Sequence, residues 1–240
     1  MKTVLVTGGT VRLGKAIAER LRADGWRVIT SSHRADAGAD VVADLAEPMG
    51  AARLYAAALQ MLGGRPPDAL VNNAALFVGD EAAIATVNLE APKKLTMMMA
   101  GREEGVGVVV NLLDAGVSGA RASGESGCSS ESSLASPGYC ETKRELAAYT
   151  LSSAMMFAAT LRVNGVAPGP VLAPTGVHEK AGETLLDRRT TADDVAAAVA
   201  YLLGAEAVTG AIIPVDAGQH LTRFNPGRCA AFVQTLGFVL

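Results

Sequence analysis

The sequence predicts an α/β fold, with a parallel, doubly wound sheet that carries helices on both faces. Two observations favour this fold. Short runs rich in β-branched residues alternate with longer Ala- and Leu-rich segments along the 240-residue chain, and a glycine-rich turn directly follows the first of these runs. Such alternation is typical of parallel sheets, because parallel neighbours need a crossover connection that is usually a helix.

Seven runs are predicted to be buried strands, and five longer segments are predicted to be helices. The strands are expected over residues 3–6, 27–30, 40–42, 69–72, 106–112, 161–166 and 211–215. The helices are expected over residues 13–23, 50–62, 83–100, 139–159 and 192–203. Leu13, Ile17 and Leu21 recur at the spacing of one helical face. Thr191 precedes two acidic residues and predicts a helix N-cap.

The composition fits one globular domain over residues 1–240. Half of the residues are hydrophobic and 19% are charged, and no repeat or linker divides the chain. The net charge of −3 gives no general attraction to nucleic acid or to anionic membranes. No apolar run approaches the roughly 20 residues of a membrane-spanning helix, and the run after Lys2 is too short for a signal-peptide core. We therefore expect a cytoplasmic protein.

Three segments depart from the regular pattern. The stretch 115–137 is rich in Ser and Gly, and the stretch 168–189 holds several Pro and Gly residues. Loops of this length usually act as functional lids or are disordered. The apolar tail over residues 225–240 is expected to cover a core edge or to pack against a neighbouring subunit.

The cysteines Cys128, Cys140 and Cys229 fit neither a disulfide framework nor a metal site. Their number is odd and their spacing is wide. We therefore predict three free thiols in a reducing compartment and no bound metal.

A glycine-rich turn, Thr7-Gly8-Gly9-Thr10-Val11-Arg12-Leu13-Gly14, lies between the first strand and the first helix. Glycine lets the backbone approach a ligand closely, and a helix start offers free N–H groups to a pyrophosphate. This position predicts a Rossmann-type dinucleotide site in which Gly8, Arg12, Leu13 and Gly14 contact the cofactor. A plain βα turn is the alternative.

The residues after the second strand predict that the dinucleotide is NADPH/NADP+. NAD sites commonly place an acid there to bind the ribose hydroxyls, whereas this chain has Ser32, His33 and Arg34 and no acid until Asp36. Arg12 and Arg34 can converge on the adenosine 2′-phosphate, because a guanidinium donates two hydrogen bonds to it. His33 can add another. Solvated surface charge is the alternative role for both arginines.

Further motifs resemble the short-chain dehydrogenase/reductase family up to about Phe224. They are Tyr139-Cys140-Glu141-Thr142-Lys143, Asn72-Asn73-Ala74-Ala75, Asn88, the run from Arg162 to Gly169, and Pro214-Val215-Asp216-Ala217-Gly218. Tyr139 and Lys143 are one helical turn apart and share a face. Such a pair alone is common in helices, but its combination with the phosphate turn is typical of this family.

The resemblance implies a role for each site residue. Tyr139 would donate the proton, Lys143 would hold the nicotinamide ribose, and Asn88 would anchor a water leading protons to Lys143. The ammonium of Lys143 and the positive nicotinamide ring together favour the phenolate, so we expect the pKa of Tyr139 to move from about 10 toward neutrality. Further cofactor contacts are expected from Ser32, Asp44, Leu45, Asn73, Ala74, Ala75, Pro168, Gly169 and Val171.

Asp114 stands at the end of the fifth predicted strand, where most members of the family carry a serine. Aspartate there resembles the pteridine and dihydromonapterin reductases, and the phosphate-turn arginine and the His-Arg pair match them too. Phe77 would stack on the pterin opposite the nicotinamide. The resemblance therefore implies an NADPH-dependent reductase of dihydropterins or dihydrofolate, with Tyr139 and Asp114 managing the proton and both contacting the substrate.

Departures around the pocket keep two other functions open. Asp114 and Tyr139 are 25 positions apart, roughly twice the usual interval of the family, and Ala75 replaces a serine that contacts the pterin. A carbonyl reductase of the 3-oxoacyl type would take its serine from the loop over residues 115–137. A non-catalytic NADPH sensor or scaffold would keep the fold without turnover, although the intact Tyr139, Lys143 and Asn88 argue against it.

The resemblance also implies a homo-oligomer, a tetramer or a dimer, with a small-molecule substrate. Family members usually assemble through the two long helices predicted over 83–100 and 139–159. Candidates for the subunit interface are Met97, Met98, Met99, Met155 and Met156. The alternative is that these methionines fill the core of their own subunit.

Overall fold

The structure, a computed structural model, describes residues 1–117, 137–169, 171, 184–186 and 188–221. Within these ranges, seven parallel strands form one sheet in the order β3-β2-β1-β4-β5-β6-β7. The strands are β1 (Thr3–Val6), β2 (Arg27–Ser32), β3 (Val41–Val42), β4 (Ala69–Asn72), β5 (Gly107–Leu112), β6 (Leu161–Pro168) and β7 (Ile212–Val215). The predicted doubly wound parallel sheet is confirmed.

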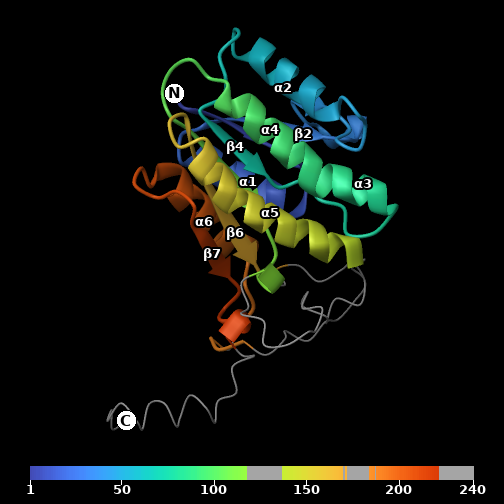
Figure 1. Cartoon of the computed structure of the whole chain (residues 1–240), viewed down its shortest axis with the longest axis vertical. Helices are drawn as coiled ribbons and strands as arrows, with labels where there is room; N and C mark the ends of the chain where they lie inside the picture. Colours follow the sequence, from blue (N-terminus) through green and yellow to red (C-terminus); the bar gives the residue numbers. More distant parts are fainter. Residues whose placement is uncertain (118–136, 170, 172–183, 187, 222–240) are drawn as a thin grey trace.

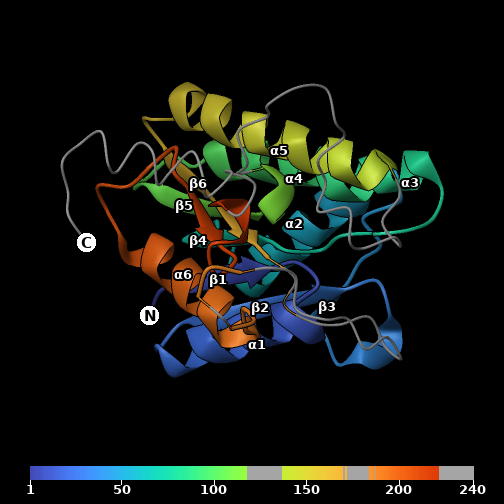
Figure 2. The ribbon, with the colours of Figure 1, turned by 90° about the horizontal axis from the view of Figure 1, so that it is seen from below.

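Helices cover both faces of the sheet, so the molecule has three layers (Figures 1 and 2). The helices are α1 (Arg12–Ala23), α2 (Gly50–Met61), α3 (Glu81–Ala85), α4 (Ala91–Ala100), α5 (Pro137–Met156) and α6 (Ala192–Gly204). Figure 2 shows α1 and α6 below the sheet and α2, α4 and α5 above it. Short helical turns η1 (Ala35–Ala37), η2 (Thr86–Glu90), η3 (Ala115–Val117) and η4 (Gln219–Leu221) connect these elements.

Aliphatic side chains fill the space between the layers. Leu5, Leu70 and Val109 point to the α2 and α4 side, while their strand neighbours such as Val4 and Val71 pack against α1 and α6. Strands buried on both faces need apolar residues at successive positions. This requirement explains the unbroken apolar runs of the sequence.

The helix predicted over 83–100 is divided by a π-helical turn. Asp80 caps α3, η2 follows, and α4 begins with Pro92 in its first turn. Proline has no N–H, so Pro92 cannot donate to the carbonyl of Asn88 and the regular α-helical ladder is interrupted there. The turn places Asn88 inside the molecule, with none of its surface exposed.

The predicted N-cap of the last helix is confirmed. Thr191 Oγ1 accepts a hydrogen bond from the Asp194 N–H at 3.2 Å, and Asp194 Oδ2 accepts one from the Thr191 N–H at 2.9 Å. This reciprocal pair is a capping box. None of the helices in the described ranges is long and apolar enough to cross a membrane.

The strand order changes direction between β1 and β4, because the chain passes outward through β2 and β3 before it returns. In open α/β sheets, ligands bind at this switch point, outside the carboxyl ends of the strands. The segments after β1, β4 and β5 meet at that edge. The loop predicted over 115–137 and the tail over 225–240 lie almost wholly outside the described residues.

Candidate active site

The glycine-rich turn after β1 forms a close backbone cradle. Gly8 has a φ of +62°, which glycine adopts readily. A Cβ at Gly14 would lie 2.1 Å from the Gly8 carbonyl oxygen, so a side chain does not fit there. Arg12 also has a positive φ of 49° and is exposed at the start of α1. A cradle that a Cβ would fill, placed at a helix N-terminus, fits a pyrophosphate.

Thr7 ties this turn to the end of β4. Its Oγ1 accepts hydrogen bonds from the Asn73 N–H at 2.9 Å and the Ala74 N–H at 3.0 Å. Asn73 Nδ2 in turn donates to the carbonyl oxygens of Thr7 at 2.9 Å and Gly8 at 3.2 Å. The predicted contacts after β1 and β4 are therefore one hydrogen-bonded unit. Thr7 was missed as a site residue, although its place before the glycines was a usable signal.

The end of β2 presents two basic side chains to solvent. His33 and Arg34 are exposed, while Ser32 is buried and its Oγ accepts the Arg34 N–H at 3.1 Å. Arg34 forms a bidentate ion pair with Asp36, with distances of 3.0 and 2.7 Å. The hydrogen bonds of this pair raise the pKa of Arg34 and lower that of Asp36. A 2′-phosphate would therefore compete with Asp36 for Arg34.

Other predicted cofactor residues differ in what they expose. Leu45 is buried in the core beside α2, so only its backbone can face a ligand. Asp44 is exposed, and its Oδ1 accepts the Ala46 N–H at 2.9 Å. After β6, the Gly169 N–H donates to the Val215 carbonyl at 2.9 Å, and Val171 packs against the core on the α1 and α6 side.

Asp114 and Tyr139 meet despite the 25 positions between them. The Tyr139 hydroxyl donates to Asp114 Oδ2 at 3.3 Å. Asp114 is held in turn because its Oδ1 accepts the Gly116 N–H at 2.9 Å and its carbonyl accepts the Val117 N–H at 3.0 Å. The predicted pairing of these two residues is present in the structure.

The pKa of Tyr139 moves in the direction opposite to our expectation. Burial raises the pKa well above its ordinary value near 10, and the neighbouring Asp114 carboxylate raises it further. Lys143 alone does not lower it, because the carboxylate adjoins the hydroxyl while Lys143 Nζ is hydrogen-bonded to the Leu112 carbonyl oxygen. The structure therefore holds Tyr139 as a phenol that retains its proton.

Lys143 lies fully inside the site. Its Nζ donates to the Leu112 carbonyl oxygen at 2.7 Å and lies 5.7 Å from the centre of the Tyr139 ring. Burial lowers the pKa of Lys143 to about 8, although the Asp114 carboxylate opposes this shift. A lysine with this pKa can exchange protons near neutral pH.

Asn88 braces the segment that leads to Phe77. Its Oδ1 accepts the Leu76 N–H at 2.8 Å, and its Nδ2 donates to the Leu76 carbonyl at 2.9 Å and to Thr142 Oγ1 at 3.4 Å. Asn88 thus joins the segment after β4 to α5, where its partner Thr142 is the residue before Lys143. Its predicted role in anchoring a water stays a prediction.

Phe77 stacks on the catalytic candidate itself. The rings of Phe77 and Tyr139 are 4.6 Å apart between centroids and inclined by 22°. Phe77 is 51% exposed, so it is not a core aromatic. The interpretation of Phe77 as a residue of the pocket is consistent with this placement.

Cys140, next to Tyr139, corrects the expectation of three free thiols. It is disulfide-bonded, whereas Cys128 and Cys229 lie outside the described residues. Within the described ranges, no cluster of three or more His, Cys, Asp or Glu residues is arranged to hold a metal ion.

Comparisons with known proteins agree with this arrangement. The family model for the short chain dehydrogenases matches residues 2–185. The putative ketoacyl reductase 2 of the granaticin polyketide synthase from Streptomyces violaceoruber is 32% identical, covering 90% of this chain and 95% of that protein. Pteridine reductase 1 from Leishmania tarentolae is 28% identical, covering 91% of this chain and 96% of that protein.

A solved structure extends the likeness to three dimensions. FolM alternative dihydrofolate reductase 1 from Brucella canis, complexed with NADP, has a TM-score of 0.76 and 29% identity. The match covers 94% of this chain and 97% of that chain. Together with the family model and the Tyr139, Lys143 and Asn88 geometry, it shows that this chain belongs to the short chain dehydrogenase family.

Proposed function

We propose that this protein is an NADPH-dependent reductase of dihydropterins, such as dihydromonapterin or dihydrobiopterin, or of dihydrofolate. The observation that carries the proposal is the Asp114–Tyr139 hydrogen bond, which puts a carboxylate where most family members have a serine hydroxyl. The likeness to pteridine reductase 1 and to an alternative dihydrofolate reductase supports it.

NADP(H) is the proposed cofactor. The solved relative complexed with NADP supports this choice, as do the exposed side chains of Arg12, His33 and Arg34 around the phosphate turn. No acidic side chain lies within Arg27–Ser32 to bind ribose hydroxyls in the manner of an NAD site. Asp36 is paired with Arg34 instead.

When bound, the cofactor supplies the hydride, and the residues of this chain manage the proton. Reduction of a C=N bond needs a proton on nitrogen, and Tyr139 holds one because burial and Asp114 both disfavour the phenolate. Lys143 has a pKa of about 8 and its Nζ lies 5.7 Å from the centre of the Tyr139 ring, so it would return a proton to Tyr139. Asp114 also offers carboxylate oxygens to the amino and ring N–H donors of a pterin.

Phe77 would orient the substrate ring. Its ring is 51% exposed and stacks on Tyr139, so a flat heterocycle that contacts the exposed part of the Phe77 ring would be held close to the proposed proton donor. Aromatic stacking suits a pterin better than an aliphatic 3-oxoacyl chain.

A carbonyl reductase of the 3-oxoacyl type is the second candidate, favoured by the likeness to a ketoacyl reductase. It would need a serine contact that Asp114 cannot supply. The serines of the predicted loop lie outside the described residues.

Oxidation of NADPH, followed optically, tests the proposal. Wild-type protein is offered dihydrobiopterin, dihydromonapterin, dihydrofolate and an acetoacetyl thioester in parallel. Turnover of a dihydropterin or dihydrofolate with little thioester turnover is the expected result. Turnover of the thioester alone would establish the second candidate, and turnover of none would point to an NADPH sensor.

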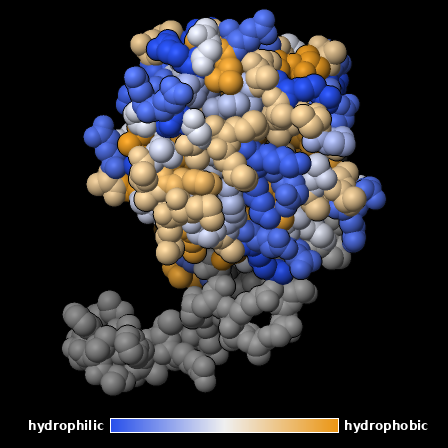
Figure 3. All heavy atoms as spheres, turned by 45° about the horizontal axis from the view of Figure 1, so that its top comes forward, coloured by the Kyte–Doolittle hydropathy of each residue, from blue (hydrophilic) through white to orange (hydrophobic). Residues whose placement is uncertain are grey.

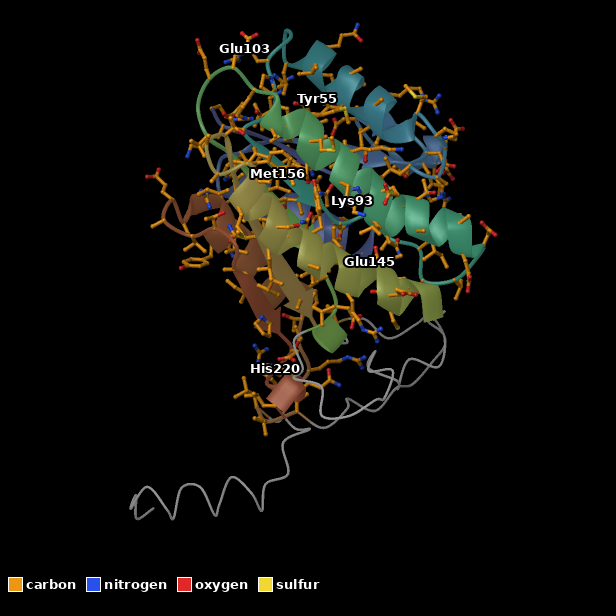
Figure 4. All side chains as sticks on the ribbon, viewed as in Figure 1. Tyr55, Lys93, Glu103, Glu145, Met156 and His220 are labelled. Carbon is orange, nitrogen blue, oxygen red and sulfur yellow. The ribbon has the colours of Figure 1, made fainter. Side chains whose placement is uncertain are left out.

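A homo-oligomer built on α4 and α5 is also proposed. Met97, Met155 and Met156 are 61%, 82% and 69% exposed on these neighbouring helices, whereas Met99 belongs to the core. Hydrophobic residues gather beside hydrophilic ones over this side of the molecule (Figure 3), and Figure 4 marks Met156 at the end of α5. Light scattering should give a dimer or tetramer for the wild type. A Met155→Glu, Met156→Glu variant should be a monomer.

The cytoplasmic location stays a prediction of the sequence. The disulfide at Cys140 is the observation that stands against it, because disulfides are rare in reducing compartments.

A further inference from the structure

A histidine paired with a buried carboxylate lies near the site without a role assigned so far. Asp216 follows β7 and its side chain is 2% exposed, whereas the His220 side chain in η4 is 20% exposed. His220 Nδ1 lies 2.8 Å from Asp216 Oδ2 and 3.0 Å from Oδ1. Figure 4 labels His220, which lies within η4, beyond the carboxyl ends of the strands.

Asp216 fixes the hydrogen-bonding sense of the imidazole. Its oxygens also accept the Gly218 N–H at 3.0 Å and the His220 N–H at 2.8 Å. Because the carboxylate acts as an acceptor at both oxygens, Nδ1 of His220 must carry the hydrogen. In a neutral imidazole, Nε2 is then an acceptor. Nε2 has no hydrogen-bond partner among the described residues, so it can accept from a ligand.

The turn that carries this pair is packed against both halves of the site. A Cβ at Gly169 would lie 2.9 Å from Asp216 Cα, so the segment after β6 lies directly against the turn. On its other side, η4 contacts η3, whose backbone N–H groups hold Asp114. The turn that carries His220 therefore lies between the segment after β6, which is predicted to contact the cofactor, and η3, which holds Asp114.

The backbone of the turn holds a non-glycine residue in the left-handed region. Ala217 adopts a φ of +52° although it is not glycine, and Gly218 follows with +80°. Such conformations cost free energy and persist where the surroundings enforce them. Here they bring the His220 ring back onto Asp216.

We propose that His220 is a substrate-recognition residue whose Nε2, oriented by Asp216, accepts a hydrogen bond from an N–H group of a heterocyclic substrate. The inference rests on the proposed function, since dihydropterins carry amino and ring N–H donors. A role limited to capping η4 needs only the backbone N–H bonds to Asp216. It does not need an imidazole nitrogen open to a ligand.

Two substitutions separate recognition from capping. His220→Asn places an amide N–H near the Nδ1 position and retains the bond to Asp216, but removes the Nε2 acceptor. His220→Gln places an amide near the Nε2 position and restores an acceptor there. Steady-state kinetics with NADPH and a dihydropterin are measured for both, together with thermal unfolding.

We expect His220→Asn to raise the KM for the dihydropterin about three- to tenfold, the effect of one hydrogen bond. Its kcat, its KM for NADPH and its Tm should change little, and His220→Gln should recover part of the lost affinity. An unchanged substrate KM in His220→Asn would overturn the inference, as would a loss of Tm that accounts for the whole defect.

The wild-type assay distinguishes failure of the proposed function from failure of this inference. If wild type reduces only the thioester, the proposed function fails, and the same kinetics are run with that substrate. A higher thioester KM in His220→Asn would then show that the acceptor binds a group other than a heterocyclic N–H, which would overturn the inference as stated. An unchanged KM would remove His220 from substrate recognition.

Discussion

The two halves of the site are built in different ways. On the cofactor side, Gly8, Gly14 and the Thr7–Asn73 hydrogen bonds fix the backbone itself, and the parts are short turns at neighbouring strand ends. On the substrate side, side chains from distant positions meet. Asp114 contacts Tyr139, and Tyr139 stacks on Phe77.

This difference indicates which half of the site can change its chemistry by substitution. A cradle made of backbone accepts the common pyrophosphate and tolerates few substitutions, because added atoms collide with the main chain. A pocket made of side chains can change its chemistry by one residue, as the carboxylate of Asp114 in place of a serine illustrates. Substitutions in the two halves should therefore separate cofactor binding from turnover.

Tyr139→Phe should have the largest effect on turnover. It removes the hydroxyl that we propose as the proton donor but retains the ring that stacks on Phe77, so kcat should fall about 10³-fold while NADPH binding is unchanged. Stopped-flow turnover and a fluorescence titration with NADPH measure the two quantities. Tyr149→Phe, which removes a hydroxyl on the same helix, is the matched control. Near-normal turnover by Tyr139→Phe would exclude its role as the acid.

Gly14→Ala should damage the cofactor half. The new Cβ would lie 2.1 Å from the Gly8 oxygen and 2.5 Å from Asn73 Nδ2, so the turn must shift. We expect a loss of about 3 kcal/mol in the free energy of unfolding and no measurable NADPH binding. Gly204→Ala is the control, because its added Cβ meets nothing within 4 Å. If calorimetry finds both variants equally stable, the close packing of the backbone around Gly14 is contradicted.

Lys143 should make stability rise with pH. The pKa of Lys143 is about 8 in the fold and 10.5 ordinarily, so between these values the unfolded chain binds a proton that the folded one lacks. Stability is then gained as pH rises through this window and lost as pH falls to about 8. Relative to Lys143→Met, wild type should gain about 2 kcal/mol from pH 8 to pH 10. Denaturant unfolding at each pH measures the free energy of unfolding of both proteins. If the two values change with pH in parallel, the lowered pKa of Lys143 in the fold is contradicted.

The smallest effects are expected at the cofactor phosphate. Arg34→Ala should raise the KM for NADPH about tenfold without changing that for NADH, because a charge-assisted contact is lost. Asp36→Asn should lower the KM for NADPH about twofold by releasing Arg34 from an exposed ion pair. Arg20→Ala, in another exposed pair, is the control. Equal effects on NADH and NADPH would remove Arg34 from 2′-phosphate recognition.

Much of the fold and of the cofactor side was predictable from sequence, because their signals are local. Apolar runs locate the strands, and a turn such as Gly8–Gly14 shows its chemistry within seven residues. The division of the helix after β4 was missed, since its cause is a single proline at 92. The pKa direction of Tyr139 was also missed, because it depends on which charge adjoins the hydroxyl. The Asp216–His220 pair likewise depends on a left-handed turn that sequence alone does not specify.

The most direct test of the Asp114–Tyr139 pair is the turnover of a dihydropterin by wild type and by Asp114→Asn, with NADPH affinity measured on the same samples. Asparagine retains the shape but not the charge of the carboxylate. We predict that wild type reduces the dihydropterin and that kcat falls about 10²-fold in the variant, with the Kd for NADPH unchanged. Equal turnover by both proteins would contradict a role for the Asp114 carboxylate in managing the proton.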